Sequence, residues 1–181
     1  MTKKKIMNEH YSLFVSGSRS IENDGIVLHI LAAAFAEFGG QPMIIRHGGA
    51  IGVDESCERV AGHFGIKTEI KKPQYHLFTG REKVRAPLAR NTDLLNASQR
   101  LVAIWDGSSL GTVDAIEKAQ EAGKAYLVYQ VTEFAFIKLA LPELNERIRR
   151  AKALRKANSP KKPAPRVNTA ADGAEPRLFE K

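Results

Sequence analysis

The stretch MIIRHGGAIGVD, residues 43–54, combines an apolar run, three glycines and the expected start of a helix. The apolar residues 43–45 predict a short buried strand, and a helix is expected to begin near Val53 or Asp54. Glycines between them allow backbone N–H groups to approach a ligand closely, and a helix N-terminus behind such a turn attracts anions. The stretch therefore predicts a phosphate-binding turn, although glycines chosen only for the shape of a tight turn would leave the same pattern.

Two further turns of small residues follow apolar runs elsewhere in the chain. Residues 11–15 (YSLFV) lead into SGSRS at 16–20, and residues 101–105 (LVAIW) lead into DGSSLGT at 106–112. Because an apolar run followed by small residues is typical of a strand and the turn after it, each pair is predicted to repeat the arrangement of the central stretch.

The predicted strands alternate with amphipathic segments of helical period. Further strands are expected at residues 67–70 and 125–129, and helices at about 20–38, 53–64, 89–98 and 113–121. Such alternation is typical of βαβ units. We therefore predict an α/β fold, a Rossmann-like three-layer sandwich with a mainly parallel sheet of about five strands. Ligands bind outside the carboxyl ends of the strands in such sheets, so the three turns are expected to form one ligand site.

The 181 residues suit one domain with a hydrophobic core. We expect a basic segment at 1–10, the Rossmann-like domain at 11–131, a helical extension at 132–157 that Pro142 interrupts, and a disordered tail at 158–181. The apolar runs are too short to cross a membrane, and no secretory signal is recognised, so the expected location is the cytoplasm. The single cysteine, Cys57, excludes an internal disulfide and is expected to be a core residue.

The excess of positive charge is concentrated at the C-terminal end. Residues 1–137 hold 16 Lys and Arg against 15 Asp and Glu, whereas residues 138–181 hold 12 against 5. This distribution is compatible with nucleic-acid binding through residues 138–166, although basic tails are often only solvated. The apolar positions in residues 134–141 would suit self-association into a homo-oligomer, which the sequence does not decide.

The chain lacks the sequence motifs of several common classes of enzyme and cofactor-binding protein. It contains neither a G-x-G-x-x-G dinucleotide fingerprint after a strand nor a P-loop. The five histidines lack metal-ligand spacing, and an acyl-transfer serine elbow is absent. The sequence therefore predicts no metal site and no cofactor. Residues 74–87 show no clear period and predict a long loop, which in a compact domain is often functional.

Four motifs in order resemble the SLOG superfamily, and within it the YspA-like branch. They are VSGSRS at 15–20, HGGAIGVD at 47–54, PLARN at 87–91 and IWDGSSLGT at 104–112, and the resemblance covers roughly residues 12–130. It implies a Rossmann-like sheet whose glycine turns bind nucleotides or nucleotide-derived ligands. The superfamily also includes the LOG phosphoribohydrolases and, more distantly, the DNA-processing protein DprA.

The resemblance implies a set of ligand- or phosphate-binding residues. Asp54 would cap its helix or hold a ribose hydroxyl, and His47 opens the central motif. The full set is Gly17, Ser18 and Arg19 in the first turn, His47, Gly48, Gly49, Gly52 and Asp54 in the central motif, Arg90 and Asn91 in the R-N pair of the PLARN motif, and Ser109, Gly111 and Thr112 in the last turn. Without the resemblance, Arg90 would be read as a surface arginine and Asn91 as a helix cap.

Three functions remain open at this level. The first is binding of a nucleotide-derived small molecule by a sensor, in which Tyr75, Phe78 or Trp105 would stack on a base, although Trp105 also suits the core. The second is phosphoribohydrolase-like cleavage of an N-glycosidic bond, with Asp114 as the catalytic carboxylate and Asp54 as the alternative. The motif after residue 105 departs from that of LOG enzymes, so binding is the safer expectation. The third is DprA-like contact with nucleic acid through the basic extension.

Overall fold

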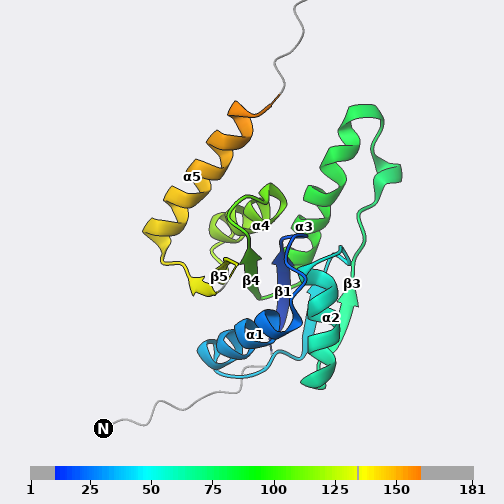
Figure 1. The fold of residues 1–181 in the computed structure, drawn as a ribbon. Helices are drawn as coiled ribbons and strands as arrows, with labels where there is room; N and C mark the ends of the chain where they lie inside the picture. The colour runs from blue at the N-terminus through cyan, green and yellow to red at the C-terminus, as the bar shows by residue number, and fades with distance from the viewer. Residues whose placement is uncertain (1–10, 134, 160–181) are drawn as a thin grey trace, which may run out of the picture.

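The computed structural model describes residues 11–133 and 135–159. They form one six-stranded sheet in the order β3-β2-β1-β4-β5-β6 (Figure 1). Five strands are parallel and β6 runs antiparallel to β5. The strands are β1 (Ser12–Gly17), β2 (Ile44–His47), β3 (Lys67–Ile70), β4 (Arg100–Trp105), β5 (Ala125–Val131) and β6 (Phe136–Lys138). The predicted Rossmann-like α/β class is therefore confirmed. The N-terminal segment 1–10 and nearly all of the predicted tail at 158–181 lie outside the described residues.

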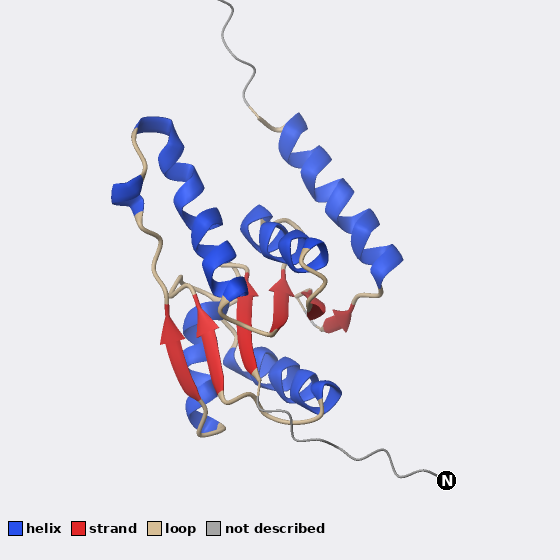
Figure 2. Cartoon of the chain, turned by 180° about the vertical axis from the view of Figure 1, so that it is seen from behind, coloured by secondary structure: helices blue, strands red, loops and turns tan. Residues whose placement is uncertain are grey.

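Helices cover both faces of the sheet. The first two helices lie on one face and the other three on the opposite face, as Figures 1 and 2 show from the front and from behind. The helices are α1 (Asp24–Phe38), α2 (Val53–His63), α3 (Ala86–Asn96), α4 (Leu110–Glu121) and α5 (Leu141–Ala157). The chain changes face after β3, so the strand order reverses between β1 and β4. Such a switch point opens a crevice at the carboxyl ends of the strands.

The core is built by the central strands, which are buried on both faces. Leu13 and Val15 of β1 pack toward α1 and α2, whereas Phe14 packs against α3 and α4. Near-continuous apolar runs are typical of parallel strands with helices on both sides. Cys57 is fully buried among these residues, and burial raises the pKa of its thiol, as expected for a core residue.

The helix boundaries follow local signals. Asn23 caps α1, with its side-chain oxygen accepting a hydrogen bond from the N–H of Ile26 at 3.0 Å. Ser20 lies in the turn before α1, where its hydroxyl donates to Asp106. Helix α2 begins at Val53, as predicted. Helix α3 begins three residues earlier than expected, because Pro87 is well suited to a first helical turn.

The C-terminal extension differs from its prediction. Instead of one helix interrupted by Pro142, the chain forms the edge strand β6 and then α5, with Pro142 in the first turn of α5. A proline there costs no helical hydrogen bond, so it starts the helix and does not break it. Leu144 and Ile148 of α5 are buried in a cluster with Trp105. Much of the apolar character that suggested a longer helix is used in pairing with β5 and in this packing; Phe134 is outside the described residues.

The segment predicted as a loop at 74–87 contains two short 3-10 helices, η1 (Tyr75–Leu77) and η2 (Gly80–Arg85). It lies between β3 and α3 and projects beside α3, away from the sheet (Figure 1). Within the described residues, no helix combines the length and apolar character needed to span a membrane.

Candidate functional site at the switch point

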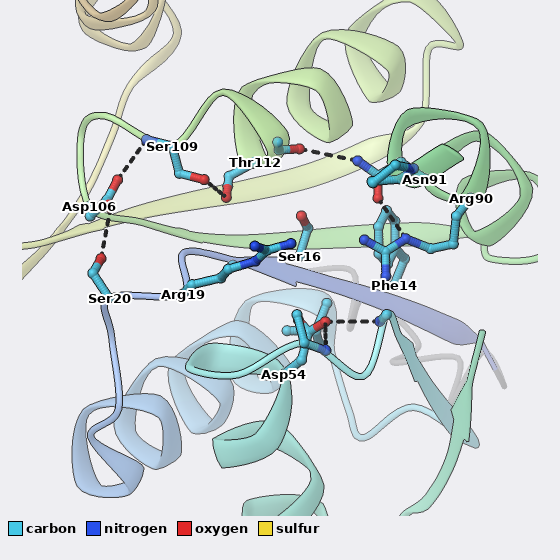
Figure 3. Close-up of a pocket in the computed structure, with 16 residues that line it drawn as sticks. Phe14, Ser16, Arg19, Ser20, Asp54, Arg90, Asn91, Asp106, Ser109 and Thr112 are labelled. Carbon is cyan, nitrogen blue, oxygen red and sulfur yellow. Dashed lines mark hydrogen bonds between the residues drawn. The ribbon is translucent and has the colours of Figure 1, made fainter. Parts of the chain in front are cut away.

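The three predicted turns meet at the switch point and surround a cavity of about 410 Å³ (Figure 3). The turn after β1, the turn after β2, the turn after β4 and the N-terminal half of α3 all contribute to its lining. Nine of the predicted ligand residues line it, namely Gly17, Arg19, Gly48, Asp54, Arg90, Asn91, Ser109, Gly111 and Thr112. Ser18, His47, Gly49 and Gly52, also predicted, lie in or behind the turns without lining the cavity.

Asp54 braces the central glycine turn. Its Oδ2 accepts hydrogen bonds from the N–H of Gly48 at 3.0 Å and the N–H of Ala50 at 3.2 Å. The side chain thus folds back over the turn that precedes its own helix. Burial raises the pKa of Asp54, while the two N–H donors and the nearby Arg90 guanidinium act in the opposite direction. The turn is therefore held in one shape before any ligand arrives.

His47 supports the same turn from behind. Its ring is buried, with Nε2 2.7 Å from Oε2 of Glu58, and its Nδ1 is 3.3 Å from the N–H of Gly49. Since Gly49 donates to Nδ1, the ring proton belongs on Nε2, which donates to Glu58. Thr68 donates to the other oxygen of that carboxylate at 2.9 Å. His47 consequently positions the turn and is not placed to touch a ligand in the cavity.

Two glycines of the motif are required by close contacts. A Cβ on Gly48 would lie 1.3 Å from Nη1 of Arg90, so only a glycine lets this guanidinium rest against the turn. Gly52 has φ +84°, and a Cβ there would lie 2.5 Å from the backbone oxygen of Arg19. Because a side chain would be strained by conformation and by contact, this glycine lets the first and second turns lie against each other.

Asp106 joins the first turn to the third, which the sequence reading did not anticipate. Its Oδ2 accepts from the hydroxyl of Ser20 at 2.7 Å, and its Oδ1 accepts from the N–H groups of Ser108 and Ser109, both at 2.8 Å. The buried Ser18 accepts from the N–H of Asp106 at 3.0 Å. Burial raises the pKa of Asp106, but these hydrogen bonds outweigh it and lower the pKa overall. An aspartate directly before small residues is the signal of such a side-chain-to-backbone turn.

The cationic part of the site comes from Arg19 and Arg90, which reach into the cavity from opposite sides (Figure 3). Nε of Arg90 donates to Oδ1 of Asn91 at 3.1 Å. Its Nη1 is buried and has no hydrogen-bond partner among the described residues. Burial lowers the pKa of Arg90, Asp54 counteracts this, and the charge of Arg19 lowers it further. Two guanidinium groups therefore share one cavity, and neither forms an ion pair with a carboxylate of the described residues.

The helix ends add to this positive potential. Helices α2 and α4 begin beside the cavity, and their N-cap residues, Gly52 and Ser109, make no side-chain capping hydrogen bond. In α2 the N–H of Val53 already donates to the carbonyl of Ser18 at 3.3 Å. Helix N-termini carry partial positive charge and free N–H donors. Together with the two arginines, they make the cavity suited to a phosphate or another compact anion.

Asp114, the predicted catalytic carboxylate, lies behind Asn91 and does not line the cavity. Its Oδ2 accepts from Nδ2 of Asn91 at 3.0 Å and from Nζ of Lys118 at 2.8 Å. Asn91 also donates to the carbonyl of Gly111 at 3.1 Å. Asp114 thus holds the side chain of Asn91, which in turn contacts the first turn of α4 through Gly111. In this structure Asp114 positions Asn91 and does not face the cavity.

The aromatic side chains expected to stack on a base are not in the cavity. Trp105 is buried in the core, and its Nε1 donates to the carbonyl of Ser109 at 3.1 Å. Tyr75 and Phe78 belong to the projecting segment. Phe14 of β1, which the sequence reading did not select, is the aromatic residue that lines the cavity. Within the described residues, no group of three or more His, Cys, Asp and Glu side chains could hold a metal ion.

The basic extension is largely neutralised where the structure describes it. Its ion pairs join Lys138 to Glu37 at 2.5 Å, Arg147 to Glu143 at 2.6 Å, Arg149 and Arg150 to Glu146 at 2.7 and 2.9 Å, and Lys152 to Glu117 at 2.6 Å. Residues 160–166 of the proposed nucleic-acid segment lie outside the described residues. The described part of the extension therefore offers few uncompensated cations.

Neither a scan against protein-family models nor a search of curated proteins finds a match to this chain. The likeness to the SLOG superfamily therefore rests on the four sequence motifs alone.

Proposed function

We propose that the switch-point cavity binds a nucleotide or nucleotide-derived ligand, with a phosphate group held by the glycine turns, Arg19 and Arg90. The observation that carries this proposal is the buried Nη1 of Arg90, which has no hydrogen-bond partner among the described residues. A buried, charged donor without a partner costs free energy, and an anion in the cavity would supply that partner. The motif resemblance to nucleotide-binding proteins supports the same ligand class.

The site favours binding over hydrolysis. Both carboxylates in the cavity lining, Asp54 and Asp106, already accept hydrogen bonds from the turns they brace. Asp114 is engaged by Asn91 and Lys118. Cleavage of an N-glycosidic bond needs a carboxylate free to stabilise an oxocarbenium-like centre or to activate water. We therefore assign the protein a sensing or ligand-holding role.

Native mass spectrometry of the purified full chain tests this proposal. The protein is measured alone and after incubation with AMP, GMP, ADP-ribose and the free nucleosides. A mass adduct with the phosphorylated compounds, absent with the nucleosides, is the expected result. Equal adducts with nucleosides, or no adduct with any compound, would contradict the phosphate-centred site, and release of free base from AMP would replace the binding role by hydrolysis.

A further inference from the structure

A second, smaller groove of about 240 Å³ lies beside the switch-point cavity, between the projecting η1–η2 segment and α3. We call it the flanking groove. Its lining includes Lys71, Lys72, Leu77, Phe78 and Arg90. Arg90 lines both the flanking groove and the switch-point cavity, so the two hollows meet at this one side chain.

The positive charge of the folded part of the chain is concentrated in the residues that form this groove. Lys71, Lys72 and Arg90 line the groove, together with one carboxylate, Asp93. Residues 71–90 contain six Lys and Arg against one Glu, whereas the remaining residues of 11–137 contain seven against thirteen acidic residues. The near-neutral total of residues 1–137 therefore conceals a strongly polarised distribution. Such a concentration of one sign next to a cavity attracts anions and guides them to it.

The cations of this segment are less neutralised than those of α5. Lys71 pairs with Asp93 at 2.9 Å, and Arg85 is 3.5 Å from Glu82. Four others, Lys72, Arg81, Lys83 and Arg90, have no ion pair among the described residues. Because these cations lie close together in the sequence and the fold, they repel one another, and an anionic ligand would reduce that repulsion.

The segment also exposes apolar surface that the fold does not use. Tyr75, Leu77 and Val84 are 47%, 64% and 75% exposed, and neither η1 nor η2 contains a buried residue. Exposed apolar groups gathered beside a polar cavity are typical of a binding surface. Cations alternating with aromatic and apolar side chains suit a ligand that carries both phosphates and bases.

From these observations we propose that the flanking groove is a second nucleotide subsite, so that the natural ligand contains two linked nucleotide units that straddle Arg90. One phosphate lies at the glycine turns, and the other lies near Lys72 with its base against Phe78 and Leu77. The inference rests on the proposed function, because it places the first unit in the switch-point cavity. The ligand is either a free dinucleotide or the end of a single strand, which share this chemistry.

Isothermal titration of the full chain with AMP and with the 5′-phosphorylated dinucleotide pApA tests the inference. We expect pApA to bind at least about tenfold more tightly than AMP, with a salt dependence of affinity steeper by roughly 0.7 log units per added phosphate contact. A 5′-phosphorylated oligoadenylate strand distinguishes the two sources. Tighter binding of the strand than of pApA assigns the groove to a single-strand end, and equal binding assigns it to a free dinucleotide.

The matched variants are Lys72→Glu, in the groove, and Lys67→Glu, an exposed residue at the other end of β3. Lys72→Glu should reduce the preference for pApA over AMP to less than about threefold, whereas Lys67→Glu should preserve it. Equal affinities of the wild-type protein for AMP and pApA, or a preference that survives Lys72→Glu, would overturn the second subsite while AMP binding upholds the proposed function. Binding of inorganic tripolyphosphate as tight as that of pApA would also overturn it. Failure of every nucleotide to bind would remove the proposed function itself.

Discussion

At the scale of single residues, the site is organised around Arg90, whose buried Nη1 has no hydrogen-bond partner among the described residues. The guanidinium of Arg90 rests against Gly48, is oriented by Asn91, and shares the cavity with Arg19. Holding a desolvated cation beside another cation lowers stability, and proteins keep such arrangements mainly where function needs them. The simplest reason for this one is an anion that binds between the two arginines.

The glycine at position 52 gives a stability prediction at this scale. Gly52→Ala would force a side chain into φ +84° and against the backbone of Arg19. We expect a loss of about 1–3 kcal/mol in the free energy of unfolding, measured by urea denaturation. The matched control is Gly62→Ala near the end of α2, the helix that Gly52 precedes; an added Cβ at position 62 meets nothing within 4 Å. It should stabilise the protein by up to about 1 kcal/mol; an equal effect of both variants would show that Gly52 is not constrained.

The sequence predicted the turns better than the direction of their side chains. Gly48, Asp54 and Arg90 were selected from motifs and do line the cavity. His47 came from the same motifs but lies behind its turn. A motif locates the end of a strand, whereas the side on which a buried side chain points depends on partners distant in sequence, such as Glu58. Asp106 was missed for the same reason, since its link to Ser20 spans 86 residues.

At the scale of elements, α5 is an integral layer of the fold and not a detachable tail. Its buried Leu144 packs with Trp105 and Val113 on the face of the sheet that α4 also covers. Leu144→Ala should therefore lower the free energy of unfolding by about 2–5 kcal/mol, as large-to-small core substitutions do. Leu154→Ala, at a position 64% exposed on the same helix, should change it by less than about 0.5 kcal/mol. Equal stabilities of the two variants in denaturant unfolding would contradict the packing of α5.

The pairing of α1 with α2 predicts a dependence of stability on pH. Arg59 donates two hydrogen bonds to Asp24, at 2.7 and 2.8 Å, and these lower the pKa of that carboxyl from 3.8 to about 2. A pKa below that of the unfolded chain means that the contribution is complete above pH 3.8 and disappears as the pH falls toward 2. The stability difference between the wild-type protein and Asp24→Asn should shrink over this interval. A difference that stays constant in acid unfolding curves would contradict the ion pair.

The elements that were predicted wrongly from the sequence lie where contacts with distant parts of the chain determine the secondary structure. The alternation of strands and helices through residues 11–131 follows from periodicity, which is local information. Residues 136–138 instead became a strand because β5 offered a free edge. Their apolar composition is equally compatible with a buried helix, so only the presence of the sheet distinguishes the two.

At the scale of the whole molecule, the distribution of charge matters more than its sum. By sequence count, most of the net charge of +8 lies in residues 138–181. In the folded chain, α5 pairs most of its cations with carboxylates, whereas residues 71–90 leave four cations without an ion pair within the described residues. A charge count over the whole of residues 1–137 hides the cluster at 71–90, because acidic residues elsewhere balance it, and only the structure shows which of these cations lack an ion pair.

An anion bound between Arg19 and Arg90 is the central expectation for this site, and one measurement tests it most directly. Isothermal titration of AMP into the wild-type protein and into Arg90→Gln compares the two affinities, with Arg149→Gln on the exposed face of α5 as the charge-matched control. Loss of charged hydrogen bonds worth about 1.5–3 kcal/mol predicts affinity roughly 10- to 100-fold weaker for Arg90→Gln, with no loss of thermal stability and with Arg149→Gln unchanged. Equal binding of AMP by the wild-type protein and Arg90→Gln would contradict the claim.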